Sequence, residues 1–140
     1  MFLPQTRLSV TVAFGALLFC TVVLVYSQMV NRIPRGEWGG THIQMNVGGK
    51  SATIEYDCAQ GEILGPLNID VRGKFKLEGT FTPERGGPIR ADDKPRSRAA
   101  IYSGEISGST MTLTLKIKGS DETETFTLER GKPGELFKCK

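Results

Sequence analysis

The sequence predicts a single all-β domain: a small antiparallel up-and-down β-barrel of about eight strands, with a β-sandwich as the alternative, preceded by one apolar N-terminal helix. Apolar and polar residues alternate with period two along most of residues 36–140. Turn signals rich in glycine separate these short segments, as in barrels and sandwiches. No stretch after residue 35 has the 3.6-residue apolar period of a helix. Closure into a barrel would also remove the exposed edges of an open sheet.

The first 27 residues differ in kind from the rest of the chain. Arg7 precedes an uncharged, mainly apolar run over residues 8–26, and polar residues follow Ser27. This order is typical of a signal peptide cleaved after Ser27. As a helix, the run would also reach roughly 28 Å, close to the ~30 Å of a bilayer core, so a retained signal-anchor is the main rival interpretation. A lipoprotein, indicated by the lipobox-like residues 17–20, is a third.

These observations divide the chain into three parts. We expect residues 1–27 to be a signal peptide or signal-anchor, residues 28–35 a tether, and residues 36–140 the barrel domain. In either case the domain is expected outside the cytoplasm. It would be periplasmic or secreted, or anchored to the inner membrane by residues 8–26 if the leader is not cleaved.

Two cysteines remain for the domain, because Cys20 lies in the apolar run. In an exported domain, the pair Cys58 and Cys139 predicts one disulfide, with two free buried thiols as the alternative. A loop this long corresponds to about 4 to 5 kcal/mol in the chain-entropy treatment. Two cysteines and the single His42 give no metal-ligand spacing, so we expect no metal and no cofactor.

The strands follow from the alternation and from the turns between them. In the first strand Trp38 has the parity of the polar face, so Gly39-Gly40 is interpreted as a bulge. Residues 59–66 are expected to be a turn, and residues 83–97, which contain three prolines, an exposed loop. The expected strands are residues 38–47, 51–58, 67–71, 74–81, 98–106, 110–117, 122–130 and 136–139.

The bulk of the inward-facing residues bears on whether the barrel holds a ligand. Trp38 and Tyr56 are the aromatic residues that would line a cavity. An eight-stranded barrel is often just wide enough for its own side chains. The bulky inward set therefore favours a filled interior over a cavity. This set is Phe75, Phe81, Met111 and Phe126.

Gly36-Glu37-Trp38 resembles the G-x-W opening of the lipocalin-like (calycin) barrels. The resemblance implies that Trp38 caps one barrel end and that Arg130, on the last barrel strand, packs across its indole. The chain is shorter than the long lipocalins and is closer in size to small calycin-like modules, including secreted bacterial protease inhibitors with one disulfide. Residues 36–140 are also similar to exported bacterial small β-barrel proteins that open with G-x-W. This likeness implies a fold and a compartment, and no activity.

His42 carries the hypothesis of catalysis. As a general base it needs an orienting carboxylate, which strand pairing would bring from Glu55 or Asp57. The simpler interpretation is a surface histidine bonded to a neighbour. No G-x-S-x-G elbow, P-loop or G-x-G-x-x-G motif occurs, so we expect no enzyme.

Charge and size bound the remaining functions. Without Arg7, 17 of the 18 Lys and Arg remain against 15 Asp and Glu, a balance that does not predict nucleic-acid binding. We expect an exported or membrane-anchored, non-enzymatic binding module for a small apolar ligand or a protein partner. The alternatives are a secreted protease inhibitor or other partner module whose segment 28–35 enters a protease cleft, and a hydrolase. The candidate ligand or partner contacts are His42, Tyr56, Arg85, Arg90 and Arg96.

Overall fold

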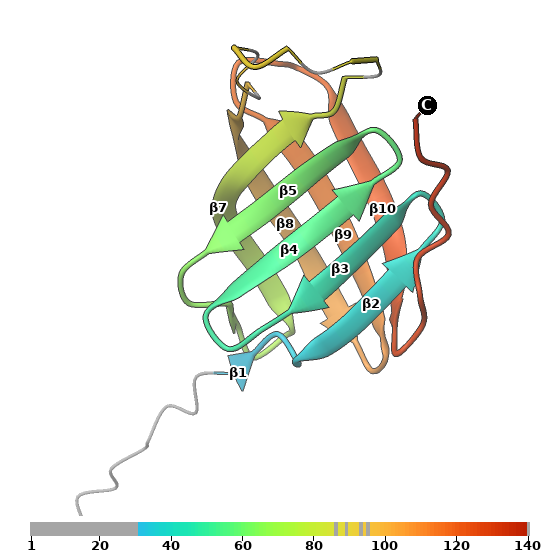
Figure 1. The fold of residues 1–140 in the computed structure, drawn as a ribbon. Coiled ribbons are helices and arrows are strands. Elements are labelled where there is room, and N and C mark those ends of the chain that lie inside the picture. The colour runs from blue at the N-terminus through green and yellow to red at the C-terminus, as the bar shows by residue number, and fades with distance from the viewer. Residues whose placement is uncertain (1–30, 86, 89, 93, 95, 140) are drawn as a thin grey trace, which may run out of the picture.

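The computed structural model describes residues 31–139 except 86, 89, 93 and 95, and within this part of the chain it is all-β with no helix. Eight antiparallel strands close into a barrel (Figure 1), which confirms the predicted fold class against the sandwich. The predicted apolar helix and leader, residues 1–27, lie outside the described residues. No helix in the described part is long and apolar enough to span a membrane.

The barrel is an up-and-down meander in which each strand pairs with the next and β10 closes onto β2. Closure depends on two register pairs, Arg130 with Trp38 and Glu129 with Gly39. A separate two-stranded sheet, β1 (Asn31–Arg32) with β6 (Asn68–Ile69), lies against one end. The barrel strands are β2 (Gly36–Gly40), β3 (Ile43–Val47), β4 (Ser51–Tyr56), β5 (Ala59–Leu64), β7 (Lys74–Pro83), β8 (Arg98–Ser107), β9 (Thr110–Ile117) and β10 (Thr123–Arg130).

The predicted first strand, residues 38–47, is two strands joined by a turn at Thr41-His42. His42 has a φ of 67°, a left-handed conformation that histidine adopts more readily than most residues. Because β2 has its own parity, Trp38 points inward and is 0% exposed without any bulge. The predicted bulge at Gly39-Gly40 is therefore wrong.

These two glycines serve close packing instead. A Cβ at Gly39 would collide with the carbonyl oxygen of Lys132, and one at Gly40 with that of Thr127. Their bare backbones allow the C-terminal segment and β10 to pass directly against β2 (Figure 1).

Three further strand predictions are wrong. Residues 59–66, expected to be a turn, contain β5, whose inward positions are filled by Ala59, Gly61 and Ile63. Of residues 67–71 only β6 is extended, and it lies outside the barrel. Residues 136–139 form no strand; the C-terminal segment makes only a single parallel bridge, between Glu135 and Thr41. The predicted number of eight barrel strands is still correct, because the division of the first strand into two and the addition of β5 offset the loss of the strands expected at residues 67–71 and 136–139.

Side chains fill the barrel from the end where β1 lies up to the level of Tyr102. Trp38, Tyr102 and Met111 are all 0% exposed, and Phe75 is buried beside them in the same core. Tyr102 lies over Gly61 and Gly79, where a Cβ would collide with its ring or hydroxyl. The predicted filling holds for Phe75 and Met111. The other two residues of that set, Phe81 and Phe126, are only partly buried, toward the opposite end.

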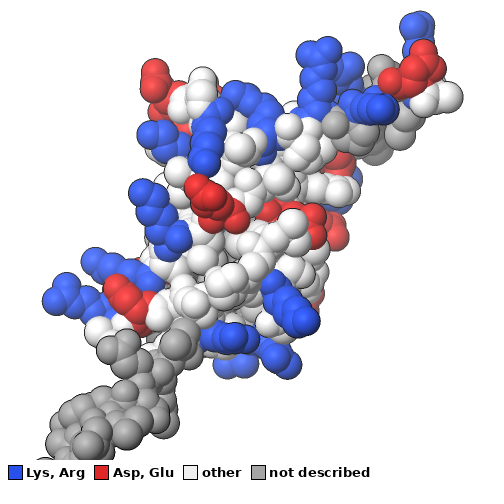
Figure 2. Space-filling view, turned by 90° about the vertical axis from the view of Figure 1, so that its left-hand side faces the viewer, with Lys and Arg blue, Asp and Glu red and all other residues white. Residues whose placement is uncertain are grey.

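The outer surface carries charges of both signs. Figure 2 shows lysine and arginine side chains interspersed with acidic ones on the face seen there, with uncharged surface between them. One ion pair of this kind joins Lys118 Nζ to Glu78 at 3.1 Å, with both side chains well exposed. Exposed pairs contribute about 0 to 1 kcal/mol, so the barrel is stabilised mainly by its core.

Candidate functional site

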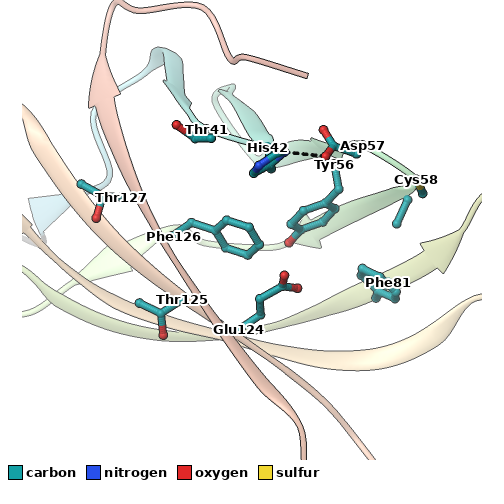
Figure 3. Close-up of a pocket in the computed structure, with 11 residues that line it drawn as sticks. Thr41, His42, Tyr56, Asp57, Cys58, Phe81, Glu124, Thr125, Phe126 and Thr127 are labelled. Carbon is teal, nitrogen blue, oxygen red and sulfur yellow. Dashed lines mark hydrogen bonds and ion pairs between the residues drawn. The ribbon is translucent and has the colours of Figure 1, made fainter. Parts of the chain in front are cut away.

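A pocket of ≈ 680 Å³ opens at the barrel end opposite β1 (Figure 1), and Figure 3 shows the residues that line it. It lies where β4 ends and β10 begins, and we refer to it as the mouth pocket. Aromatic and hydroxyl side chains form most of its wall, with one histidine and two carboxylates. The lining residues are Thr41, His42, Tyr56, Asp57, Cys58, Ala59, Phe81, Glu124, Thr125, Phe126 and Thr127.

Tyr56 is the innermost polar residue of the mouth pocket. It follows Ala52 and Ile54 on the inward face of β4 and is 6% exposed. Its ring lies between those of Phe81 and Phe126, with centroids at 5.6 and 5.4 Å. Its hydroxyl is hidden from solvent and forms no hydrogen bond of ordinary geometry with a described residue. Such a group is costly to bury, so its position is notable. The Tyr102 hydroxyl lies near enough to raise the pKa of Tyr56, but its own proton is donated to the Thr80 carbonyl.

Tyr102 shows the ordinary arrangement for a buried tyrosine. Its hydroxyl donates to the Thr80 carbonyl oxygen at 2.7 Å. Burial raises the pKa of Tyr102 to about 12. Burial also raises the pKa of Tyr56, and the nearby Tyr102 hydroxyl and Glu124 carboxylate raise it further. Both phenols therefore stay protonated at neutral pH, so the Tyr56 hydroxyl keeps its proton and can act as a donor.

Glu124 is an exposed carboxylate on the inward-facing side of β10. Along β10 it shares the inward parity of Leu128, which is fully buried, and Phe126, which is partly buried. Its register partner on β9 is the buried Leu115. Figure 3 shows its carboxylate turned toward the Tyr56 side chain rather than away from the barrel. The row of inward side chains thus changes from apolar in the core to acidic at the mouth.

His42 and Asp57 form a pair at the rim. His42 precedes β3 and Asp57 follows β4, so the pairing of these strands places them opposite each other, with Nδ1 2.6 Å from Oδ2. The structure thus brings Asp57 to His42, whereas Glu55 pairs with Gln44. Asp57 also accepts the backbone N–H of Phe137 at 2.8 Å. That N–H, followed by the His42 hydrogen bond, lowers the pKa of Asp57.

The chemistry open to this pair is limited. With Nδ1 bonded to Asp57, Nε2 is the nitrogen left to exchange a proton. Among the described residues, no hydroxyl or thiol forms a hydrogen bond with His42. The Cys58 sulfur, which also lines the mouth pocket, is held in a disulfide. The pair therefore has the oriented base of a hydrolase but no nucleophile joined to it.

The C-terminal segment is bound along the rim, and the His42–Asp57 pair is part of that attachment. The predicted pair Cys58–Cys139 is bonded in the structure, with Cα atoms 5.3 Å apart. The Glu135 carbonyl accepts the His42 N–H at 2.8 Å, and the Phe137 ring lies 5.3 Å from that of His42. These contacts fix one wall of the mouth pocket to the chain terminus.

Trp38 and Arg130 occupy the opposite end of the barrel. The indole Nε1 donates to the Pro34 carbonyl at 3.0 Å, and Arg130 Nη2 donates to the Arg35 carbonyl at 3.2 Å. Both side chains thus bind the segment that enters β2, and the predicted stacking of Arg130 on the indole stays a prediction. Within the expected tether, Ile33 is 2% exposed, so the part described is attached to the barrel.

The remaining candidates do not reach the mouth pocket. Arg85, Arg90 and Arg96 are exposed on the loop between β7 and β8 and are not part of its lining. The described residues contain no group of three His, Cys, Asp or Glu side chains that could hold a metal ion. Glu124 was missed in the sequence analysis. Its signal was parity, since it lies two residues before Phe126, on the face expected to be apolar.

Comparison of the chain with protein-family models, with curated proteins and with solved structures found no match. The geometry of the mouth pocket is therefore the basis for the function proposed below.

Proposed function

We propose that this chain is an exported or membrane-anchored, non-enzymatic binding module of lipocalin-like barrel type that holds a small, largely apolar ligand in the mouth pocket. The leader supports the compartment, because residues 8–26 have the length and composition of a signal peptide or anchor. The pocket supports the activity. It is a concave, partly aromatic site with a few polar groups, within the size range of small-molecule sites.

The observation that carries the proposal is the unpartnered Tyr56 hydroxyl. A buried donor without an acceptor costs about 1 to 3 kcal/mol. Tyr56 bears this cost beside Phe81 and Phe126, whose partly exposed rings line the pocket and offer an apolar surface to a ligand. A ligand with a hydrogen-bond acceptor would satisfy the hydroxyl and contact both rings.

The proposal is tested by filling the mouth pocket from its wall. Ala59 lines the pocket and is 5% exposed, so Ala59→Leu would occupy ligand volume. Ala99→Leu makes the same change at an exposed position of β8 outside the pocket and is the matched control. We expect 1-naphthylmethanol, followed by calorimetry, to bind the wild type and Ala99→Leu but to bind Ala59→Leu at least about tenfold more weakly. Equal binding by both variants would exclude the mouth pocket as the site.

A second candidate is a secreted protease inhibitor or other partner module, and one feature favours it. Val71 is 92% exposed on a turn fixed by Asp70, whose Oδ1 accepts the backbone N–H groups of Arg72 and Lys74, both at 2.8 Å. The turn thus presents Val71 and Arg72 in a set conformation. The candidate predicts inhibition of a trypsin-like protease that Arg72→Ala removes and Arg90→Ala, in the exposed loop, does not. Absence of inhibition by the wild type across serine and metalloproteases would reject it.

A further inference from the structure

We infer that the mouth pocket selects ligands in which a protonated amine is carried on an aromatic or other apolar stem. The inference rests on the proposed function, because it names the ligand class of that same pocket. It starts from the charges of the lining. Two carboxylates, Asp57 and Glu124, line the pocket together with His42, and no lysine or arginine does so. The lining itself is therefore acidic, although the whole chain has a formal net charge of +3 and Lys138 lies at the rim beside the Tyr56 carbonyl.

The two carboxylates are not equivalent. Asp57 is engaged by the His42 ring and by the Phe137 N–H. Glu124 forms neither an ion pair nor a hydrogen bond with any described residue. Arg98 also has inward parity, at the start of β8, but it is not part of the pocket lining. Glu124 is therefore the charge in the mouth pocket that a ligand would meet.

The position of Glu124 in the barrel wall indicates which ligand charge would be favoured. The inward neighbours of Glu124 along β10 and across to β9 are apolar, namely Phe126, Leu128 and Leu115. When a ligand covers the mouth, this carboxylate loses water, and that loss is unfavourable unless a positive group replaces it. An ammonium group supplies the opposite charge and up to three donors.

The aromatic rings and Tyr56 provide a second, independent observation. The buried Tyr56 hydroxyl is turned toward Phe126 and Glu124 (Figure 3), and the rings of Phe81 and Phe126 lie tilted beside its ring. A cation near aromatic faces is stabilised by their quadrupoles. An ammonium group would therefore lie beside Glu124, while the apolar stem lies against the partly exposed rings of Phe81 and Phe126.

Three probes of the same shape and different charge test the inference. These are 1-naphthylmethylamine, 1-naphthylmethanol and 1-naphthoate, titrated at neutral pH and followed by calorimetry. We expect the amine to bind about fivefold more tightly than the alcohol, in line with a partly exposed ion pair, and the carboxylate to bind most weakly. Added salt should reduce the preference for the amine.

Two variants that each remove one negative charge, at different positions, show where the preference for the amine arises. Glu124→Gln should abolish the preference for the amine and leave the affinity for the alcohol unchanged. Glu122→Gln, in the turn before β10 and outside the pocket lining, should keep the preference. Equal loss in both variants would overturn the inference, because the preference would then come from overall charge. Equal binding of amine and alcohol by the wild type would overturn the inference and leave the proposed function standing, whereas no binding of any probe would overturn both.

Discussion

The Tyr56 hydroxyl leads to a prediction of unusual sign: its removal should stabilise the ligand-free protein. In Tyr56→Phe the ring keeps its contacts with Phe81 and Phe126, and only an unpartnered buried donor is lost. Relief of that burial is worth about 1 to 2 kcal/mol. For a domain of this size we expect a rise in Tm of about 4 to 8 °C.

Tyr102→Phe is the matched control, because it deletes the same atom from the same core. The Tyr102 hydroxyl donates to the Thr80 carbonyl at 2.7 Å, so this variant loses a hydrogen bond and should be destabilised by about 1 to 2 kcal/mol. Urea unfolding with the disulfide intact, supported by calorimetry, measures both changes. The two variants should differ by about 2 to 4 kcal/mol and in sign. Equal destabilisation of both would show that Tyr56 has a partner and would refute the reasoning.

Three further predictions concern the rim and the C-terminal segment. Cys139→Ser should lower the free energy of unfolding by about 4.5 kcal/mol in the chain-entropy treatment, since the disulfide spans 81 residues. The double variant Cys58→Ser/Cys139→Ser should lose no more stability than the single variant, and additive losses would argue against the bond. Gly39→Ala should lower the free energy of unfolding by about 1 to 3 kcal/mol, because its Cβ meets the Lys132–Pro133 backbone. Gly49→Ala should change it little, because that Cβ meets only the flexible Arg35 side chain. Similar values for the two variants in urea unfolding would contradict the packing described. The pKa of Asp57 is lowered from its usual 3.8, so its contribution to the free energy of unfolding should be complete above that pH and lost as the pH falls below it. The stability difference between wild type and Asp57→Asn should therefore shrink on acidification. A difference that stays constant with pH would exclude this linkage.

The fold class was accessible from the sequence because barrel walls repeat a local pattern. The segment with Met111, Leu113 and Leu115 alternates so regularly that its strand bounds were predicted correctly. The prediction of one continuous first strand failed because the two central residues of the turn, Thr41 and His42, are not usual turn formers, and the preceding Gly39-Gly40 was interpreted as a bulge. The alternation of inward and outward residues was counted through this turn as if the strand continued, which placed Trp38 on the wrong face.

Strand β5 was missed for a different reason, which lies in long-range packing. Gly61 stands at an inward position because the Tyr102 hydroxyl, from a distant strand, occupies the space that a side chain would need. A glycine among polar residues resembles a turn when only its neighbours in sequence are known. The false strand at residues 67–71 shows the converse, since Leu67 and Ile69 pack against the core from outside the barrel.

The candidate site was predicted in part. Tyr56 and the approach of Asp57 to His42 followed from alternation and hairpin pairing. Glu124 required knowledge that the inward row of β10 ends at an open mouth, which depends on how all eight strands close. That information is three-dimensional, so nothing in the sequence alone was a reason to single out a carboxylate between threonines.

The most direct test of the central claim is a two-dimensional NMR titration of the isotope-labelled protein with 1-naphthylmethanol, followed through the backbone amides. The claim that the mouth pocket is the ligand site predicts progressive shifts confined to its lining, strongest near Tyr56, Glu124 and Phe126, with the Trp38 end unchanged. Shifts centred on the Trp38 end, or no shifts at millimolar probe, would contradict it.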